Sequence, residues 1–399
     1  ALPGWLEEMV KIMEDESVGI VGSKLLYPDG TIQHAGLIMV KNRQDPLFAR
    51  LIYNREVGDL PEANKLMDYQ GVIGACMLIR KELFFEVGGF GEEFVNGNED
   101  VDLCLKVRQK GYRVIYCPKS VLYHYESVSE GRFKYVDQNV FNMHKNWLGR
   151  VKPDLVEDDI LTSIIIPVFN MVNFTRVCIK SISKYTLEPF ELIIINNGST
   201  DSTGQYLREL SLHYNNVKVI NNKTNKGFGG ACNQGIKAAS GEYVLILNND
   251  AVVTEGWLAR MLKKGESNKN IGIIGPRSNA VSGAQLVGRV PYSSEQGMHE
   301  FAHRIAVKYF DQGFETNRLV AFCMLVKKEV IDRIGGFDLR FGAGNFEDDD
   351  FCLRAQIAGY KLWVCNDVFV HHFASKTFLG NKLDHGRLMA ENWGKFKEK

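Results

Sequence analysis

Leu161-Thr-Ser-Ile-Ile-Ile-Pro167 is a short, apolar, β-branched run, and Val168-Phe-Asn170 follows it directly. Such a run is typical of a parallel strand that is buried on both faces. Similar runs end at Ile195, Ile220 and Leu247, and segments with helical spacing separate them. Strands that alternate with helices in this way predict βαβ units, and therefore an α/β fold with an open, mostly parallel sheet.

Polar or glycine-rich segments follow four of these predicted strands, at residues 168–170, 196–201, 225–235 and 248–250. Each segment alone would be an ordinary turn. In open parallel sheets, however, ligands bind beyond the carboxyl ends of the strands. Four such segments at one edge therefore predict a nucleotide-type pocket.

Asp250 stands at the end of the apolar run 244–247. A carboxylate at a strand end is suited to hold a hard divalent cation that bridges a diphosphate. One carboxylate supplies only part of a coordination sphere, and His372, after the apolar run 368–370, is the best candidate for a further ligand. The alternative for His372 is a structural role.

Four consecutive acids, Glu347, Asp348, Asp349 and Asp350, open a helix that we predict over residues 347–358. Carboxylates in the first turn also complement the helix dipole, by roughly 0.3–1 kcal/mol each, so capping is the alternative explanation. Four acids exceed what capping needs. We therefore expect one or two of them to face a site.

The chain also repeats itself. Gly74-Ala-Cys-Met-Leu-Ile-Arg-Lys-Glu82 matches Ala321-Phe-Cys-Met-Leu-Val-Lys-Lys-Glu329, and further matches follow up to His124 and His372. A period this long indicates a duplicated domain. We predict a complete domain at 160–399, a linker at 151–159, and at 1–150 only the C-terminal half of a first copy. The start at Ala1, close to a repeat landmark, indicates a fragment of a longer protein.

Composition limits the remaining possibilities. The chain has 399 residues, 45% of them apolar, and 48 basic residues balance 48 acidic ones. It is therefore long enough for two globular domains, and its charge does not favour nucleic acid as a partner. No apolar run approaches the ~20 residues of a membrane span. The eight cysteines form no C-x-x-C pair, which predicts buried thiols in a reducing, cytoplasmic compartment.

As a set, these motifs resemble glycosyltransferase family 2, the inverting enzymes of GT-A fold. The matching segments are residues 164–170, 195–201, 225–235, 247–250, 335–338, 347–348 and 372. The resemblance implies a Rossmann-like nucleotide-binding sheet, a nucleotide-diphosphate sugar as donor, and Mn²⁺ or Mg²⁺ at an Asp-x-Asp motif. Asn248 replaces the first Asp of that motif, which leaves Asp250 as the main metal carboxylate.

The resemblance also implies roles for individual residues. Asp348 would be the general base, with Glu347 beside it and Asp349 as its nearest rival, and Asp250 and His372 would bind the metal. Contacts to the donor are implied for Pro167, Phe169, Asn170, Asn196, Asn197, Ser199, Asp201, Lys226, Gly227, Asn233, Asn248, Asn249 and Asp250. In the first copy, Asp100 and His124 would be the base and the metal ligand, but its donor-binding half is absent.

We therefore expect an inverting transferase that moves a sugar from a nucleotide-diphosphate sugar to a glycan. Residues 25–36 and 122–127 resemble enzymes of O-antigen and other cell-surface polysaccharide assembly. If the glycan is lipid-linked, the protein would associate peripherally with the inner face of the cell membrane.

Two other functions stay open. A catalytically degenerate glycan-binding or scaffold protein is favoured by Asn248 and by the incomplete first copy. A nucleotidyltransferase would also place a metal at Asp250. It would not need the Gly-Gly-Phe segment, the Glu-Asp pair or the distal histidine.

Overall fold

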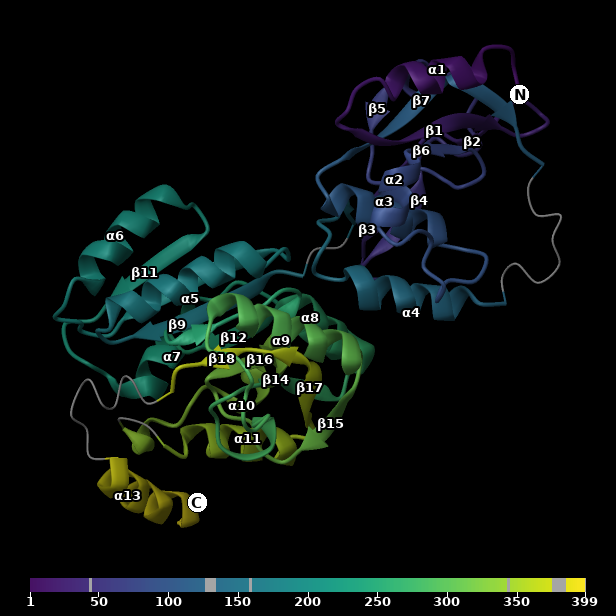
Figure 1. Cartoon of the computed structure of the whole chain (residues 1–399). Coiled ribbons are helices and arrows are strands. Elements are labelled where there is room, and N and C mark those ends of the chain that lie inside the picture. The colour runs from purple at the N-terminus through teal and green to yellow at the C-terminus, as the bar shows by residue number, and fades with distance from the viewer. Residues whose placement is uncertain (43–44, 126–133, 158–159, 343–344, 375–384, 399) are drawn as a thin grey trace. The chain divides into compact units, whose positions relative to one another are not determined.

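The computed structural model describes the chain except for residues 43–44, 126–133, 158–159, 343–344, 375–384 and 399. It contains two compact units, Ala1–Asp158 and Asp159–Lys399, coloured purple to blue and teal to yellow in Figure 1. Both combine helices with β-sheets. Within the described parts of the chain, no helix has the length and the apolar character that crossing a bilayer requires.

The second unit is built on one eight-stranded sheet in the order β11-β10-β9-β12-β16-β14-β17-β15. Strands β11, β10, β9 and β12 are parallel neighbours, whereas β16 runs antiparallel between β12 and β14. The α/β prediction is confirmed, and the predicted parallel arrangement holds for these first four strands. The strand bounds are β9 (Thr162–Val168), β10 (Phe190–Asn196), β11 (Val217–Asn221), β12 (Tyr243–Leu247), β14 (Ile271–Arg277), β15 (Gly313–Thr316), β16 (Cys323–Lys327) and β17 (Lys361–Phe369).

Helices cover both faces of this sheet, which explains why β9 is apolar at successive positions. Ile164 and Ile166 belong to a core cluster with α5 and α8, while Ile165 belongs to the cluster with α7 and α11. All three are fully buried, and each burial contributes about 1.5–3 kcal/mol. The helix bounds are α5 (Val172–Tyr185), α6 (Thr203–His213), α7 (Gly227–Ala238), α8 (Trp257–Ser267), α9 (Glu295–Lys308), α10 (Lys328–Ile334), α11 (Glu347–Ile357) and α13 (His385–Lys397), with short 3₁₀ turns η2 (Gly283–Gln285) and η3 (Leu339–Phe341).

The first unit has a sheet in the order β2-β1-β7-β5, with β6 paired to β1, and a small sheet in the order β4-β3-β8. Its strands are β1 (Val18–Leu26), β2 (Ile32–His34), β3 (Leu37–Lys41), β4 (Phe48–Leu51), β5 (Met67–Asp68), β6 (Met77–Ile79), β7 (Arg113–Tyr123) and β8 (Leu155–Val156). Its helices are α1 (Trp5–Ile12), η1 (Pro61–Asn64), α2 (Lys81–Glu86), α3 (Glu99–Gln109) and α4 (Val136–Trp147).

Part of the segment predicted as a linker, residues 151–159, is bonded to the first unit. β8 pairs with β3, and the carboxylate of Asp154 accepts a 2.8 Å hydrogen bond from the backbone N–H of Met39. Asp154, an acidic residue of this segment, therefore supplies a polar contact to the first unit. The eight cysteines are free thiols, and all but Cys76 are buried, which agrees with the prediction of buried thiols.

Candidate active site

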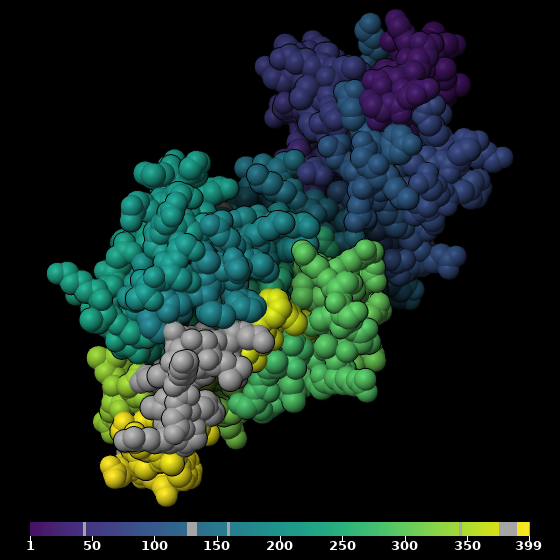
Figure 2. Space-filling model, turned by 60° about the vertical axis from the view of Figure 1, so that its left-hand side comes forward, coloured from purple at the N-terminus to yellow at the C-terminus, as the bar shows by residue number. Residues whose placement is uncertain are grey.

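One cavity of about 1490 Å³ opens at the carboxyl ends of β9, β10 and β12. In Figure 2 the teal surface of the parallel strands and their helices adjoins the green surface of the later elements, on the unit that holds this cavity. The cavity brings together residues from sequence segments that lie far apart. The predicted site residues that line it are Pro167, Phe169, Asn197, Lys226, Gly227, Asn248, Asn249, Asp250, Glu347, Asp348, Asp349 and His372.

A pair of two-residue strands places Asp250 beside His372. β13 (Ala251–Val252) pairs antiparallel with β18 (His371–His372), and Ala251 lies opposite His372. The Nε2 atom of His372 therefore lies 3.2 Å from Oδ1 of Asp250. These strands are too short to show periodicity, so only the family resemblance could indicate this contact from the sequence.

The tautomer of His372 is set by its other ring nitrogen. Nδ1 lies 2.8 Å from the carbonyl oxygen of Ala280, and because a carbonyl only accepts, Nδ1 must carry the proton. In the neutral ring, Nε2 then directs its lone pair toward Asp250 and toward the amide of Asn248, 3.3 Å away. A histidine whose far nitrogen donates to a carbonyl is the usual arrangement of a metal ligand.

The residues at this corner fit a divalent cation held in part by the protein. A carboxylate oxygen and an imidazole lone pair at 3.2 Å are bridged favourably by a cation or a proton. Among the described residues, no third His, Cys, Asp or Glu is placed to complete a metal site. The remaining coordination positions would therefore belong to a ligand and to water.

A second group of carboxylates lies at the start of α11. Asp348 is only 8% exposed. Its side chain accepts hydrogen bonds from the N–H groups of Ala321, at 3.3 Å, and Asp349, at 3.0 Å. Burial, together with the charge of Asp349, raises the pKa of Asp348 to about 7, although Arg318 opposes the shift. A carboxyl with this pKa can accept a proton and remain a useful base near neutral pH.

Glu347 lies beside Asp348 and is equally buried. Its Oε2 atom has no hydrogen-bond partner among the described residues. Burial and the charge of Asp348 raise the pKa of Glu347. Buried carboxylate oxygens are normally paired, so an unpaired one in a cavity wall favours a role in ligand binding.

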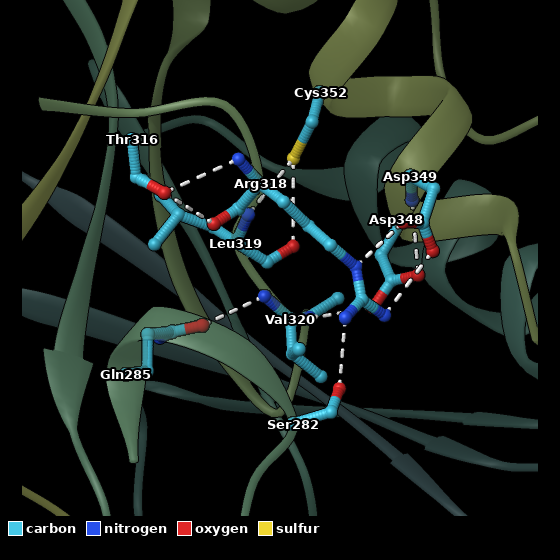
Figure 3. A network of polar contacts seen from close by, with 10 residues as sticks. Ser282, Gln285, Thr316, Arg318, Leu319, Val320, Asp348, Asp349 and Cys352 are labelled. Atoms are coloured by element: carbon cyan, nitrogen blue, oxygen red, sulfur yellow. Dashed lines mark hydrogen bonds and ion pairs between the residues drawn. The ribbon is translucent and has the colours of Figure 1, made fainter. Parts of the chain in front are cut away.

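Arg318 distinguishes Asp349 from Asp348 (Figure 3). Its Nε atom lies 2.5 Å from Oδ1 of Asp349, and its Nη1 donates to the hydroxyl of Ser282 at 2.9 Å. The charge of Asp349 is therefore compensated by a guanidinium. Asp350 is likewise paired, with Arg354 at 2.8 Å. Asp348 is the aspartate of this group without an ion pair of its own in the described structure.

Sequence reasoning did not identify Arg318. It precedes the matched segment 321–329, and the equivalent position of the first copy is Gly71. Comparison of the two copies would have drawn attention to it. The loop formed by residues 278–283 also lines the cavity, through residues 280–282.

Four predicted donor-binding residues lie outside the cavity wall and cross-link two loops instead. Asn170 bonds to the backbone N–H of Thr200 and donates its own N–H to Ser199. Asn196 accepts from the N–H of Ser199, and Asp201 accepts from the N–H groups at the starts of α5 and α6. Their polar groups shape the loops that carry Phe169 and Asn197.

Asn233 also lies outside the cavity wall. Its amide donates to the carbonyl of Phe337 and accepts from the N–H of the same residue, both at 2.8 Å. The side chain therefore joins α7 to the segment after α10. A sequence pattern cannot separate this structural amide from one that faces a ligand.

Asn197 lines the cavity, but its amide is already saturated. Its oxygen accepts from the N–H of Lys226 and from Asn222, and its nitrogen donates to Asn225 and to the carbonyl of Gly227. An amide can make about four such bonds. Asn197 therefore fixes the loop before α7, which presents Lys226 to the cavity.

Comparison with known proteins identifies a family for part of the chain. Residues 163–335 match the family model described as glycosyl transferase family 2. The chain carries a family 2 glycosyltransferase domain. The confirmed α/β fold and the recognition from motifs agree with this assignment.

Individual relatives match the chain over limited segments. The O-antigen biosynthesis protein RfbC of Myxococcus xanthus is 35% identical over 128 residues, which are 32% of this chain and 10% of that protein. Glycosyltransferase GlyG of Streptococcus pneumoniae is 29% identical over 232 residues, 56% of this chain and 74% of the relative. The mannosyltransferase PcManGT of Pyrobaculum calidifontis, solved with GDP-Man and Mn²⁺, has 19% identity and a TM-score of 0.42, over 59% of this chain and 64% of that one.

Proposed function

We propose that residues 160–399 transfer a sugar, with inversion, from a nucleotide-diphosphate sugar to a hydroxyl group of a glycan. The observation that carries the proposal is that one cavity holds the Asp250–His372 pair and the base Asp348. The pair suits a metal-bound diphosphate, and the base suits an acceptor hydroxyl. Lys226 and Arg318 add positive charge to the same walls.

The size of the cavity supports two substrates rather than one. Pockets for single small ligands measure about 300–1,000 Å³, and this cavity measures about 1490 Å³. A nucleotide sugar in contact with the terminal residue of a glycan would need the larger volume. The name of the relative RfbC, an O-antigen biosynthesis protein, favours a cell-surface polysaccharide as the acceptor.

The proposed reaction is a single displacement. The acceptor oxygen attacks the anomeric carbon, the bond from that carbon to the diphosphate breaks, and the hydroxyl proton passes to the carboxylate of Asp348. A positioned base of this kind contributes about 10²–10⁴-fold. Attack from the face opposite the leaving group inverts the anomeric configuration.

Asp250 and His372 would hold the metal, which we propose to be Mn²⁺ or Mg²⁺. When bound, such an ion neutralises charge that develops on a leaving diphosphate. The protein's own contribution at this corner is the fixed tautomer of His372, set by the carbonyl of Ala280. Lys226, at the start of α7, would contact the phosphates from the other side.

Donor binding is the first test. The full chain is titrated calorimetrically with a panel of nucleotide sugars, with and without Mn²⁺, beside Asp250→Ala and the control Asp332→Ala. Asp332 is an exposed aspartate that pairs with Lys328. We expect one donor to bind in a metal-dependent way, and only Asp250→Ala to abolish it. Failure of every donor to bind folded protein would instead favour the degenerate scaffold.

Transfer is the second test. Asp348→Asn should bind the donor with wild-type affinity and lose about 10²–10⁴-fold in kcat, while NMR of the wild-type product should show an inverted anomeric centre. Because burial raises the pKa of Asp348, wild-type activity should rise with pH through a range well above that of an ordinary aspartate. If Asp349→Asn lost this much kcat and Asp348→Asn did not, the base would be Asp349.

A further inference from the structure

The first unit contains its own cavity, of about 630 Å³, between the start of α3 and the end of β7. Its walls include Glu92, Glu99, Asp100 and His124, together with the ring of Phe90. None of these residues takes part in the site of the second unit. Phe90 is 46% exposed, so its ring is available to a ligand.

The backbone around Asp100 repeats the geometry around Asp348. Asp100 Oδ2 accepts from the N–H of Gly74 at 2.7 Å and its Oδ1 from the N–H of Val101 at 2.8 Å. The equivalent bonds of Asp348 come from the N–H groups of Ala321 and Asp349. As in the second unit, burial raises the pKa of this carboxyl.

Other equivalent features surround these carboxyls. The residue before each acidic helix is left-handed, with φ of 69° at Asn98 and 71° at Phe346. The fourth residue of each helix is an aspartate that pairs with a base one turn later, Asp102 with Lys106 and Asp350 with Arg354.

The sheets correspond as well. β1 lies between parallel β7 and antiparallel β6, as β14 lies between parallel β17 and antiparallel β16. The two units share the left-handed residue before the acidic helix, the ion pair in its first turns and the strand order. Together these features indicate that the first unit repeats residues 256–399.

The two cavities differ in charge. Arg318 and Asp349 form an ion pair in the second unit, and their equivalents in the first are Gly71 and Val101. No lysine or arginine stands among the described residues that line the first cavity, although three carboxylates do. Such walls repel a diphosphate, since like charges at close range disfavour each other.

The first cavity also lacks the imidazole–carboxylate pair of the second unit. His372 lies 3.2 Å from Asp250, whereas within the described residues no ion pair joins His124 to a carboxylate. The orientation of the His124 ring is fixed by a 2.7 Å hydrogen bond between its Nδ1 and Oε1 of the buried Gln33. The polar groups of the cavity are therefore mostly hydrogen-bond acceptors, beside one exposed aromatic ring.

We propose that this cavity binds an uncharged pyranoside of a glycan, without nucleotide or metal. Sugar hydroxyls are donors that carboxylates and Gln33 can accept, and the apolar face of a pyranose ring packs on an aromatic side chain such as Phe90. The proposal rests on the proposed function in one respect, because the repeated geometry is what favours a saccharide. The first unit would then hold the glycan at a point distinct from the site of transfer.

Saturation-transfer NMR on the full chain tests this, with EDTA present and no nucleotide. The probes are methyl glycosides of glucose, galactose, mannose, rhamnose and N-acetylglucosamine. We expect at least one to bind, and Phe90→Ala to weaken it about tenfold. Phe85→Ala is the matched control, because both rings pack edge-on against Phe84, at 5.5 and 5.6 Å, and Phe85 is also exposed.

Variants in the second unit separate the two sites. Asp250→Ala and Asp348→Asn should leave the part of the glycoside signal that depends on Phe90 unchanged, whereas Asp100→Asn should reduce that part, and uridine diphosphate should not compete for it. Absence of binding by all five probes would overturn the proposal, as would a signal that Asp348→Asn abolishes and Phe90→Ala does not. Metal-dependent donor binding is measured separately by calorimetry, so its failure would refute the proposed function without refuting this site.

Discussion

Asp348→Asn should make the protein more stable while it slows transfer by about 10²–10⁴-fold. Burial raises the pKa of Asp348 from its usual 3.8 to about 7. Since one pKa unit corresponds to about 1.4 kcal/mol, keeping this side chain ionised costs the folded state about 4 kcal/mol. Asparagine avoids that cost because it has no charge.

The gain is reduced by one hydrogen bond. An asparagine keeps a single acceptor oxygen, so its amide nitrogen would face either the N–H of Ala321 or that of Asp349. An unpaired N–H costs about 1 kcal/mol or more. The net increase in the free energy of unfolding should therefore be about 3 kcal/mol at about pH 8.

The dependence on pH is the decisive part of this prediction. The folded protein keeps the Asp348 proton to a higher pH than the unfolded chain does, so wild-type stability falls as pH rises between the two pKa values. The advantage of Asp348→Asn should therefore shrink to about 1 kcal/mol at about pH 5. The hydrogen-bond cost cancels from this difference.

Urea unfolding measures the effect, with hydrogen exchange of β12 identifying the transition of the second unit. Asp332→Asn, which neutralises an exposed carboxyl, should change stability by less than about 0.5 kcal/mol at either pH. If Asp348→Asn is equally stabilising at both pH values, or destabilising at both, the reasoning about the buried carboxyl is refuted.

Three further substitutions have separate expected outcomes. Asn233→Ala should lower the free energy of unfolding by about 1–3 kcal/mol, since it leaves the N–H and carbonyl of Phe337 unpaired, and calorimetry should find donor affinity unchanged; a lost donor site with unchanged stability would contradict this. Arg318→Met should shift the pH at which kcat/KM rises to a higher value, because Arg318 lowers the pKa of Asp348. Arg318→Lys should shift it less. An unchanged pH profile in both variants would show that Arg318 does not influence the ionisation of Asp348. His372→Ala should raise the Mn²⁺ concentration needed for donor binding about 100-fold, and an unchanged Mn²⁺ titration would remove His372 from the metal site.

The fold was predictable where apolar runs are continuous and turns are polar. The runs at 161–167 and 244–247 match β9 and β12 to within a residue at either end, because burial on both faces leaves a continuous apolar run. α10 ends at its cap residue, Gly335, whose φ of 78° suits glycine. Such signals are local, and local signals can be read from a sequence.

The site was less predictable, because its contacts are long-range. The amides of Asn170, Asn196 and Asn233 have the same chemistry as a donor contact and differ only in what they face. Arg318 belongs to no motif, and although the two copies differ at its position, its role depends on the long-range contact of its guanidinium with Asp349. The pairing of Asp250 with His372 depends on β13 and β18, which have no periodicity to detect.

The antiparallel pairing of β13 with β18 has a consequence for the order in which the protein becomes competent. A ribosome releases the parallel strands β9 to β12, and Asp250 with them, long before β18 is synthesised. Because domains acquire structure progressively during synthesis, the nascent sheet would form without the imidazole of His372. Under the proposed function, affinity for a cation would then appear only after β18 docks on β13, later than the sheet that carries Asp250.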